Sequence, residues 1–185
     1  MSRMAAPFVP LMLRIFFCFT LVVCAAITAV SQNNLKIGSI APQFSSTAID
    51  GKTYDLAAMR GQVVVITFWS TRCIICQSEL PKLDRMMSRY DGRRVQFLAL
   101  TSEDESRVRY YLSLNRVAST ILPNSFGTLL QYADRDPGGN VNIAYPAFFV
   151  VDQEGKIQYR NSGYDKTGAL SSTVDRLLAK GAVAE

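Results

Sequence analysis

The sequence predicts one α/β domain with a central mixed β-sheet and helices on both faces, preceded by an apolar leader. An apolar run rich in β-branched residues at 63–69 and a second mainly apolar run at 95–100 are each followed by a segment with helical spacing. Near the C-terminus, segments 147–152 and 156–160 are joined by Glu154-Gly155, which is typical of a hairpin. With 49% hydrophobic and 19% charged residues in 185, the composition is that of a globular chain.

Strands and helices differ in the spacing of their apolar residues, and this spacing gives the expected order of the elements. Residues 63–69 are apolar almost throughout, which indicates a strand covered on both faces. Asp50-Gly51 is the expected turn of the first hairpin. The weakest pattern lies at 119–141. The expected elements are a hairpin over 35–55, a helical turn over 56–61, a strand over 63–69, a helix over 73–90, a strand over 95–100, a helix ending near 115, a short helix over 126–132, a hairpin over 147–160 and a last helix over 170–180.

Helix ends are marked by particular side chains. Pro81 lies in the middle of the expected 73–90 helix and should bend it. Ser102 and Glu105 have the spacing of a capping box, which predicts that the helix ending near 115 begins there. Thr167 is the expected cap of the last helix, and Gly181 is its expected end.

The first 31 residues read as a targeting segment. A net positive start is followed by residues 15–30, which carry no charge, and by small residues at Ala29 and Ser31. This order is typical of a secretory signal. The apolar run is slightly shorter than an ordinary membrane span, which favours a cleaved signal, and an uncleaved anchor is the alternative. We therefore expect residues 1–31 to be a signal peptide or N-terminal membrane anchor, and 32–185 to be an exported, periplasmic or extracytoplasmic domain.

Several classes of chemistry are excluded by composition. The chain has no histidine, so Ser-His-Asp and Cys-His catalysis, histidine-containing zinc sites and histidine-ligated haem are not available. The net charge of +5 includes Arg3 and Arg14 of the leader, and the remaining excess is too small and scattered to indicate nucleic-acid binding. No cofactor and no metal are expected.

The cysteines indicate redox chemistry. Cys18 and Cys24 belong to the leader, which leaves Cys73 and Cys76 in the exported part. A bridge between two cysteines so close in sequence closes almost no loop and adds little stability, so it is expected to react rather than to stabilise. A zinc half-site is the alternative, but it needs two further ligands. At the start of a helix, free N–H groups favour the Cys73 thiolate, while Cys76 lies one turn further in.

The surrounding motifs resemble the thioredoxin superfamily and, within it, exported thiol-disulfide oxidoreductases of the TlpA/ResA type. The family pattern W-x-x-W-C-x-x-C-x-x-E-x-P is matched except at its second tryptophan, where Arg72 stands. Residues 145–157 resemble the cis-proline strand and hairpin of that family, and the resemblance as a whole covers about 37–178. It implies a thioredoxin-like fold. The matching residues of the first motif are Trp69, Cys73, Cys76, Glu79 and Pro81.

The resemblance also implies roles for individual residues. Cys73 would be the nucleophile and Cys76 the resolving thiol, joined as a redox-active disulfide, and Glu79 would relay protons to Cys76. Pro146 would be the cis-proline facing the disulfide, and Tyr145 would offer backbone hydrogen bonds to a substrate segment. Trp69 is assigned to substrate binding, with a place in the core as an equal alternative.

The implied function is an enzyme that exchanges disulfides with protein thiol or disulfide substrates outside the cytoplasm. Cytochrome c maturation and envelope disulfide reduction are the expected contexts, and a membrane electron donor of the thiol-disulfide type is a further expected partner. One alternative is a peroxiredoxin-like peroxidase of the AhpC/TSA type, but its PxxxTxxC context is absent because Ile66 and Ser70 occupy the key positions. A second alternative, a copper-binding chaperone, needs a histidine and a wider cysteine spacing.

Overall fold

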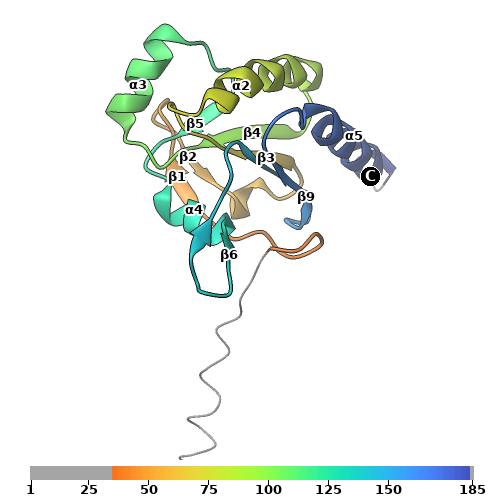
Figure 1. The fold of residues 1–185 in the computed structure, drawn as a ribbon. Coiled ribbons are helices and arrows are strands. Elements are labelled where there is room, and N and C mark those ends of the chain that lie inside the picture. Colours follow the sequence, from red (N-terminus) through yellow and green to blue (C-terminus); the bar gives the residue numbers. More distant parts are fainter. Residues whose placement is uncertain (1–34, 184–185) are drawn as a thin grey trace, which may run out of the picture. The chain divides into compact units, whose positions relative to one another are not determined.

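A five-stranded mixed sheet forms the centre of the computed structural model, which describes residues 35–183 (Figure 1). The strand order is β5-β4-β3-β8-β9; β3, β4 and β5 run parallel, and β8 and β9 are antiparallel to their neighbours. The predicted α/β architecture is thereby confirmed. The strands are β3 (Val63–Phe68), β4 (Val95–Leu100), β5 (Thr120–Leu122), β8 (Ala147–Val151) and β9 (Ile157–Ser162).

Two hydrophobic layers cover the sheet, one on each face. Every residue of β3 is buried: Val63 and Val65 face one layer, whereas Ile66 faces the other. Helices α2, α3 and α5 lie on the first face and α4 lies on the second, as Figure 1 shows. The helices are α2 (Ile74–Met87), α3 (Glu105–Leu114), α4 (Phe126–Tyr132) and α5 (Thr167–Val183), with 3-10 turns η1 (Ala57–Met59) and η2 (Ser88–Tyr90).

Two small antiparallel hairpins complete the described chain. The first joins β1 (Ser45–Thr47) to β2 (Thr53–Asp55) through the predicted Asp50-Gly51 turn. The second joins β6 (Asp134–Arg135) to β7 (Val141–Asn142), and it was not expected from the sequence. β5 was also missed, whereas α4 has the predicted bounds.

Three helix boundaries differ from prediction. The helix expected over 73–90 is shorter, because η2 replaces its last turn. α3 is capped by Asp104 rather than Ser102: the Asp104 carboxylate accepts a hydrogen bond from the Arg107 N–H at 2.9 Å. α5 begins at Thr167 and continues through Gly181, where a Cβ would lie 2.9 Å from the Gln153 side chain. Gly181 therefore serves close packing and does not end the helix.

The register of β3 sets the place of the site. Phe68 pairs with Leu100 on one side and with Ala147 on the other. The residues that follow β3 and β4 therefore meet the residues that precede β8 at the same end of these strands. Carboxyl ends of parallel strands are the usual place for binding sites in α/β folds.

The start of the described chain is bound to the outer strand β9. The Gly38 N–H donates to the Ile157 carbonyl at 2.7 Å, and the Ile157 N–H donates to the Ser39 carbonyl at 2.9 Å. Arg160 donates to the Leu35 carbonyl at 2.6 Å and forms an ion pair with Asp134 at 2.6 Å. One arginine thus joins β9, the β6–β7 hairpin and the beginning of the domain.

The turn between β8 and β9 allows a test of the fold. Gly155 has φ +79°, and a Cβ there would lie 0.8 Å from Arg60 Nη1. We expect Gly155→Ala to lower the free energy of unfolding by about 1–2 kcal/mol, mainly through left-handed strain, with a small addition because the exposed Arg60 side chain must move. Gly51 has φ +80° with no atom near its missing Cβ, so Gly51→Ala should cost only about 1 kcal/mol. Equal losses in urea unfolding would show that Arg60 moves aside without cost.

The expected targeting segment, residues 1–31, lies outside the described residues. Within residues 35–183, no helix combines the length and apolar character needed to cross a bilayer.

Candidate active site

Cys73 and Cys76 form a disulfide at the N-terminus of α2, with their Cα atoms 5.1 Å apart. Cys73 is the N-cap residue of this helix, and its Sγ accepts a hydrogen bond from the Cys76 N–H at 3.1 Å. Cys73 is half-buried, whereas Cys76 is 0% exposed. One sulfur is therefore within reach of another molecule and the other is covered. An N–H group aimed at Sγ also favours the thiolate when the bridge opens.

Apolar side chains surround the reachable sulfur. Ile74 is 81% exposed and Ile75 is 43% exposed, although both are β-branched aliphatic residues. They occupy the first turn of α2, between the two cysteines. The site therefore presents an apolar surface beside Cys73, which suits contact with a polypeptide better than contact with a small polar solute.

Glu79 lies three residues beyond Cys76 on α2, and its side chain is only 1% exposed. Its Oε1 accepts a hydrogen bond from Lys82 Nζ at 2.7 Å, while Oε2 has no partner among the described residues. The hydrogen bond from Lys82 to Glu79 raises the pKa of the Lys82 ammonium above its usual value. A buried carboxylate with one free oxygen is thus held on the same helix as the covered thiol. This matches the position expected for a proton-transferring group.

Lys82 is itself held by the loop between β9 and α5. Its ammonium lies 4.1 Å from the centre of the Tyr164 ring and 3.8 Å from an Asp165 carboxylate oxygen. Neither Lys82 nor Tyr164 was singled out from the sequence, since a lysine followed by a tyrosine more than 80 residues later carries no local signal.

The Tyr145–Pro146 peptide bond is cis, and Pro146 is buried. The Pro146 carbonyl accepts a hydrogen bond from the Gly163 N–H at 2.8 Å. In contrast, the Tyr145 backbone forms no hydrogen bond with another backbone group within residues 35–183. Burial raises the pKa of the Tyr145 hydroxyl; the Ser102 side chain lowers it, and the Glu103 carboxylate raises it further. Tyr145 therefore reaches the loop that follows β4.

Trp69 lies in the core beneath the site rather than on its surface. It is 0% exposed, and its ring centre is 5.3 Å from that of Tyr111. Its Nε1–H has no hydrogen-bond partner among the described residues. Of the residues singled out from the sequence, Cys73 and Tyr145 are the ones with partly exposed side chains; Cys76, Glu79, Trp69 and Pro146 are buried.

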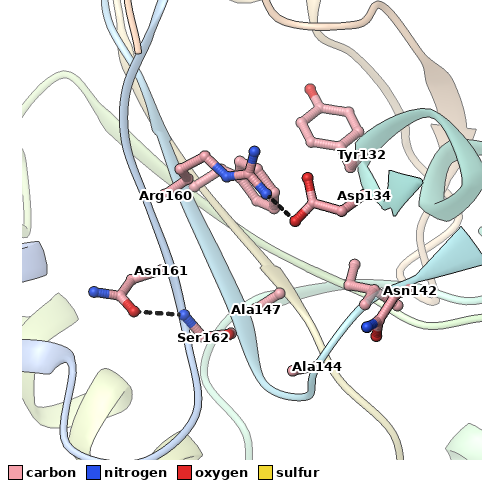
Figure 2. A pocket seen from close by; sticks show the side chains of 10 residues that line it. Tyr132, Asp134, Asn142, Ala144, Ala147, Arg160, Asn161 and Ser162 are labelled. Atoms are coloured by element: carbon pink, nitrogen blue, oxygen red, sulfur yellow. Dashed lines mark hydrogen bonds and ion pairs between the residues drawn. The ribbon is translucent and has the colours of Figure 1, made fainter. Parts of the chain in front are cut away.

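A cavity of about 290 Å³ lies beside the residues that flank the cis-proline. Figure 2 shows Ala144 and Ala147 at its edge, with the ion pair between Arg160 and Asp134 on the opposite side. Asn142 and Asn161 add amide groups to its lining, so the cavity is polar. Within residues 35–183, no three Cys, Asp or Glu side chains lie close enough together to hold a metal ion.

This chain is similar to known thioredoxin-like proteins in sequence and in fold. The family model described as the AhpC/TSA family matches residues 37–160. The thiol-disulfide oxidoreductase ResA of Bacillus thuringiensis (strain Al Hakam) is 26% identical over 131 residues, covering 68% of this chain and 69% of the relative. The thioredoxin-like protein YneN of Bacillus subtilis (strain 168) is 29% identical over 127 residues, covering 67% of this chain and 70% of the relative.

A solved structure shares the fold as well. The exposed lipoprotein thioredoxin of Streptococcus pneumoniae superposes with a TM-score of 0.61 and 25% sequence identity, covering 74% of this chain and all of the other (100%).

Proposed function

This chain belongs to the AhpC/TSA family and is a thioredoxin-like thiol-disulfide oxidoreductase, and from that premise we propose that Cys73 and Cys76 exchange disulfides with protein substrates outside the cytoplasm. The observation that carries the proposal is the unequal exposure of the two sulfurs. Cys73 is partly exposed at a helix N-terminus, and Cys76 is 0% exposed. Cys73 is thus the attacking group and Cys76 the resolving group.

The reaction consists of two exchanges. In the reduced protein, the Cys73 thiolate attacks one sulfur of a substrate disulfide, forms a mixed disulfide and releases the other substrate sulfur as a thiolate. Cys76 then loses its proton to Glu79 and attacks Cys73 Sγ, which forms the Cys73–Cys76 disulfide and releases the second substrate thiol. The substrate gains two electrons and two protons in total. The reverse sequence oxidises a dithiol.

The substrate segment is held beside the disulfide by the residues before β8. The Tyr145 backbone groups accept the segment in an extended pairing, and Pro146 shapes the surface next to Cys73. Trp69 supports this surface from the core. Ile74 and Ile75 contact apolar side chains that flank the substrate cysteine. A membrane dithiol protein returns the pair to its reduced form, and cytochrome c maturation or envelope disulfide reduction is the wider context.

Export is the second part of the proposal. Residues 1–31 act as a signal peptide or membrane anchor, and 32–185 form the thioredoxin-like domain; the exposed lipoprotein relative supports this location. We expect protease added to spheroplasts to digest the domain while a cytosolic marker stays intact. Protection until the cells are lysed would place the domain inside the cytoplasmic membrane.

Activity assays separate this function from a peroxidase, which the name of the matched family brings into question. The reduced protein should reduce the disulfides of insulin with dithiothreitol as electron donor, and Cys73→Ser should abolish the reaction. Peroxide consumption should stay at the rate of free dithiothreitol, because Ile66 and Ser70 stand where the peroxidase motif needs proline and threonine. Fast peroxide turnover with slow insulin reduction would reverse the assignment. Stoichiometric copper(I) binding with neither activity would favour a chaperone.

A further inference from the structure

The carboxylate of Glu103 contacts the turn that carries Cys73. Oε2 accepts a hydrogen bond from the Thr71 N–H at 2.8 Å. Oε1 accepts bonds from the Thr71 hydroxyl at 2.8 Å and from the Ser70 hydroxyl at 3.2 Å. Charged acceptors form the stronger hydrogen bonds in proteins, and three donors on two adjacent residues give this carboxylate a defined position.

Within residues 35–183, the other hydrogen bonds of this turn are to neighbours in sequence. The Cys73 N–H donates to the Ser70 carbonyl at 3.2 Å, and the Gln77 side chain donates to the Thr71 carbonyl at 3.0 Å. Within residues 35–183, the side-chain hydrogen bonds that reach Ser70 and Thr71 from outside residues 69–77 all come from Glu103. Glu103 therefore connects this turn to the loop that follows β4.

Glu103 is fixed in turn by its own loop and by the loop that follows β5. Its N–H donates to the Thr101 hydroxyl at 3.3 Å, and its carbonyl accepts from the Asn124 N–H at 2.9 Å. Its charge also acts on the hydroxyl of Tyr145. Glu103, a half-buried residue of the loop after β4, thus bonds to the loop after β3 through its carboxylate and to the loop after β5 through its carbonyl.

We propose that Glu103 is a positioning residue, which holds the turn that carries Cys73 so that a protein disulfide can be bound against it. The inference rests on the proposed function, since it concerns the fit of a polypeptide substrate. A small disulfide needs only the Cys73 sulfur, whereas a protein disulfide also needs the surface around Cys73 in its proper place. Loss of Glu103 should therefore lower the activity toward protein disulfides more than the activity toward small disulfides.

The test compares two disulfides that Cys73 attacks in the same way: insulin and Ellman's small aromatic disulfide. In Glu103→Ala we expect kcat/KM for insulin to fall about tenfold through a higher KM, because the turn beside Cys73 no longer holds the surface that binds the polypeptide. The rate with Ellman's disulfide should stay within about twofold, because the sulfur itself is unchanged. Glu103→Gln, which keeps the shape but puts an N–H₂ group against these donors, should show an intermediate loss and serves if Glu103→Ala does not fold.

Asp104→Ala is the matched control. It removes the cap of α3 at the adjacent residue, so it lowers stability without touching the turn. Its insulin KM should equal that of the unsubstituted protein. An equal fall with both disulfides, an unchanged insulin KM in Glu103→Ala or the same KM change in Asp104→Ala would overturn the inference. Failure of the unsubstituted protein to reduce insulin would instead overturn the proposed function, and the inference with it.

Discussion

Cys76→Ser should accumulate covalent adducts with its substrate proteins, while Cys73→Ser should accumulate few. In the proposed reaction the partly exposed Cys73 sulfur forms the mixed disulfide, and the buried Cys76 sulfur resolves it. Removing Cys76 leaves the first exchange intact and blocks the second. Adducts that disappear on treatment with dithiothreitol can be separated on a non-reducing gel and identified by mass spectrometry, which would also name the substrate.

The double variant Cys73→Ser with Cys76→Ser controls for adducts at the leader cysteines, Cys18 and Cys24. It should trap nothing beyond background. The opposite pattern, with adducts on Cys73→Ser and none on Cys76→Ser, would exchange the roles of nucleophile and resolving thiol.

Glu79→Gln should slow the second exchange about a hundredfold at neutral pH, because a positioned base contributes at least that much to a proton transfer. Glu79 is buried one turn beyond Cys76, and its Oε2 has no hydrogen-bond partner among the described residues, so we propose this oxygen as the acceptor of the Cys76 proton. Ellman's disulfide separates the two steps, since one coloured thiolate leaves at attack and the other at resolution. The first release should be unchanged, and the pH dependence of the second should differ.

Two variants on the same helix distinguish proton transfer from loss of structure. Asp84→Asn changes a half-buried carboxylate that accepts a bond from the Ala118 N–H, away from the disulfide. It should leave both releases unchanged. Lys82→Met removes the partner of Glu79 and should alter only the second release. Identical pH profiles for the second release in Glu79→Gln and the unsubstituted protein would leave Glu79 as a structural residue.

The parts of the fold that could be predicted are those with strong local signals. β3 is apolar except at Thr67 and β4 is apolar except at Gln96, so both were placed from the sequence. β5 has only three residues and pairs in parallel with β4, so no hairpin turn in the sequence indicates its position. The cap of α3 was misplaced because Ser102 and Asp104 both have capping side chains, and only tertiary contacts decide between them.

The site residues that could be predicted are likewise those with local sequence signals. The cysteine pair and Pro146 belong to contiguous motifs, and the structure places a disulfide and a cis peptide bond there. Glu103 and Lys82 act through contacts that depend on the folded chain: Glu103 meets Thr71 across 32 residues of sequence. In the sequence, Glu103 lies in a charged run that reads as an ordinary solvated helix start.

The attachment of residues 35–40 to the edge strand determines how the domain would respond to mechanical tension. A pull applied through the N-terminal side of the domain enters at Leu35 and is transmitted first to β9, through Arg160 and the backbone bonds around Ile157. β8 separates this strand from β3, which carries the turn before Cys73. Force would thus be absorbed by the outermost hydrogen bonds before it reached the reactive pair. If the proposed membrane anchor is retained, β9 and β8 would stand between a pull on it and the strand that leads to Cys73.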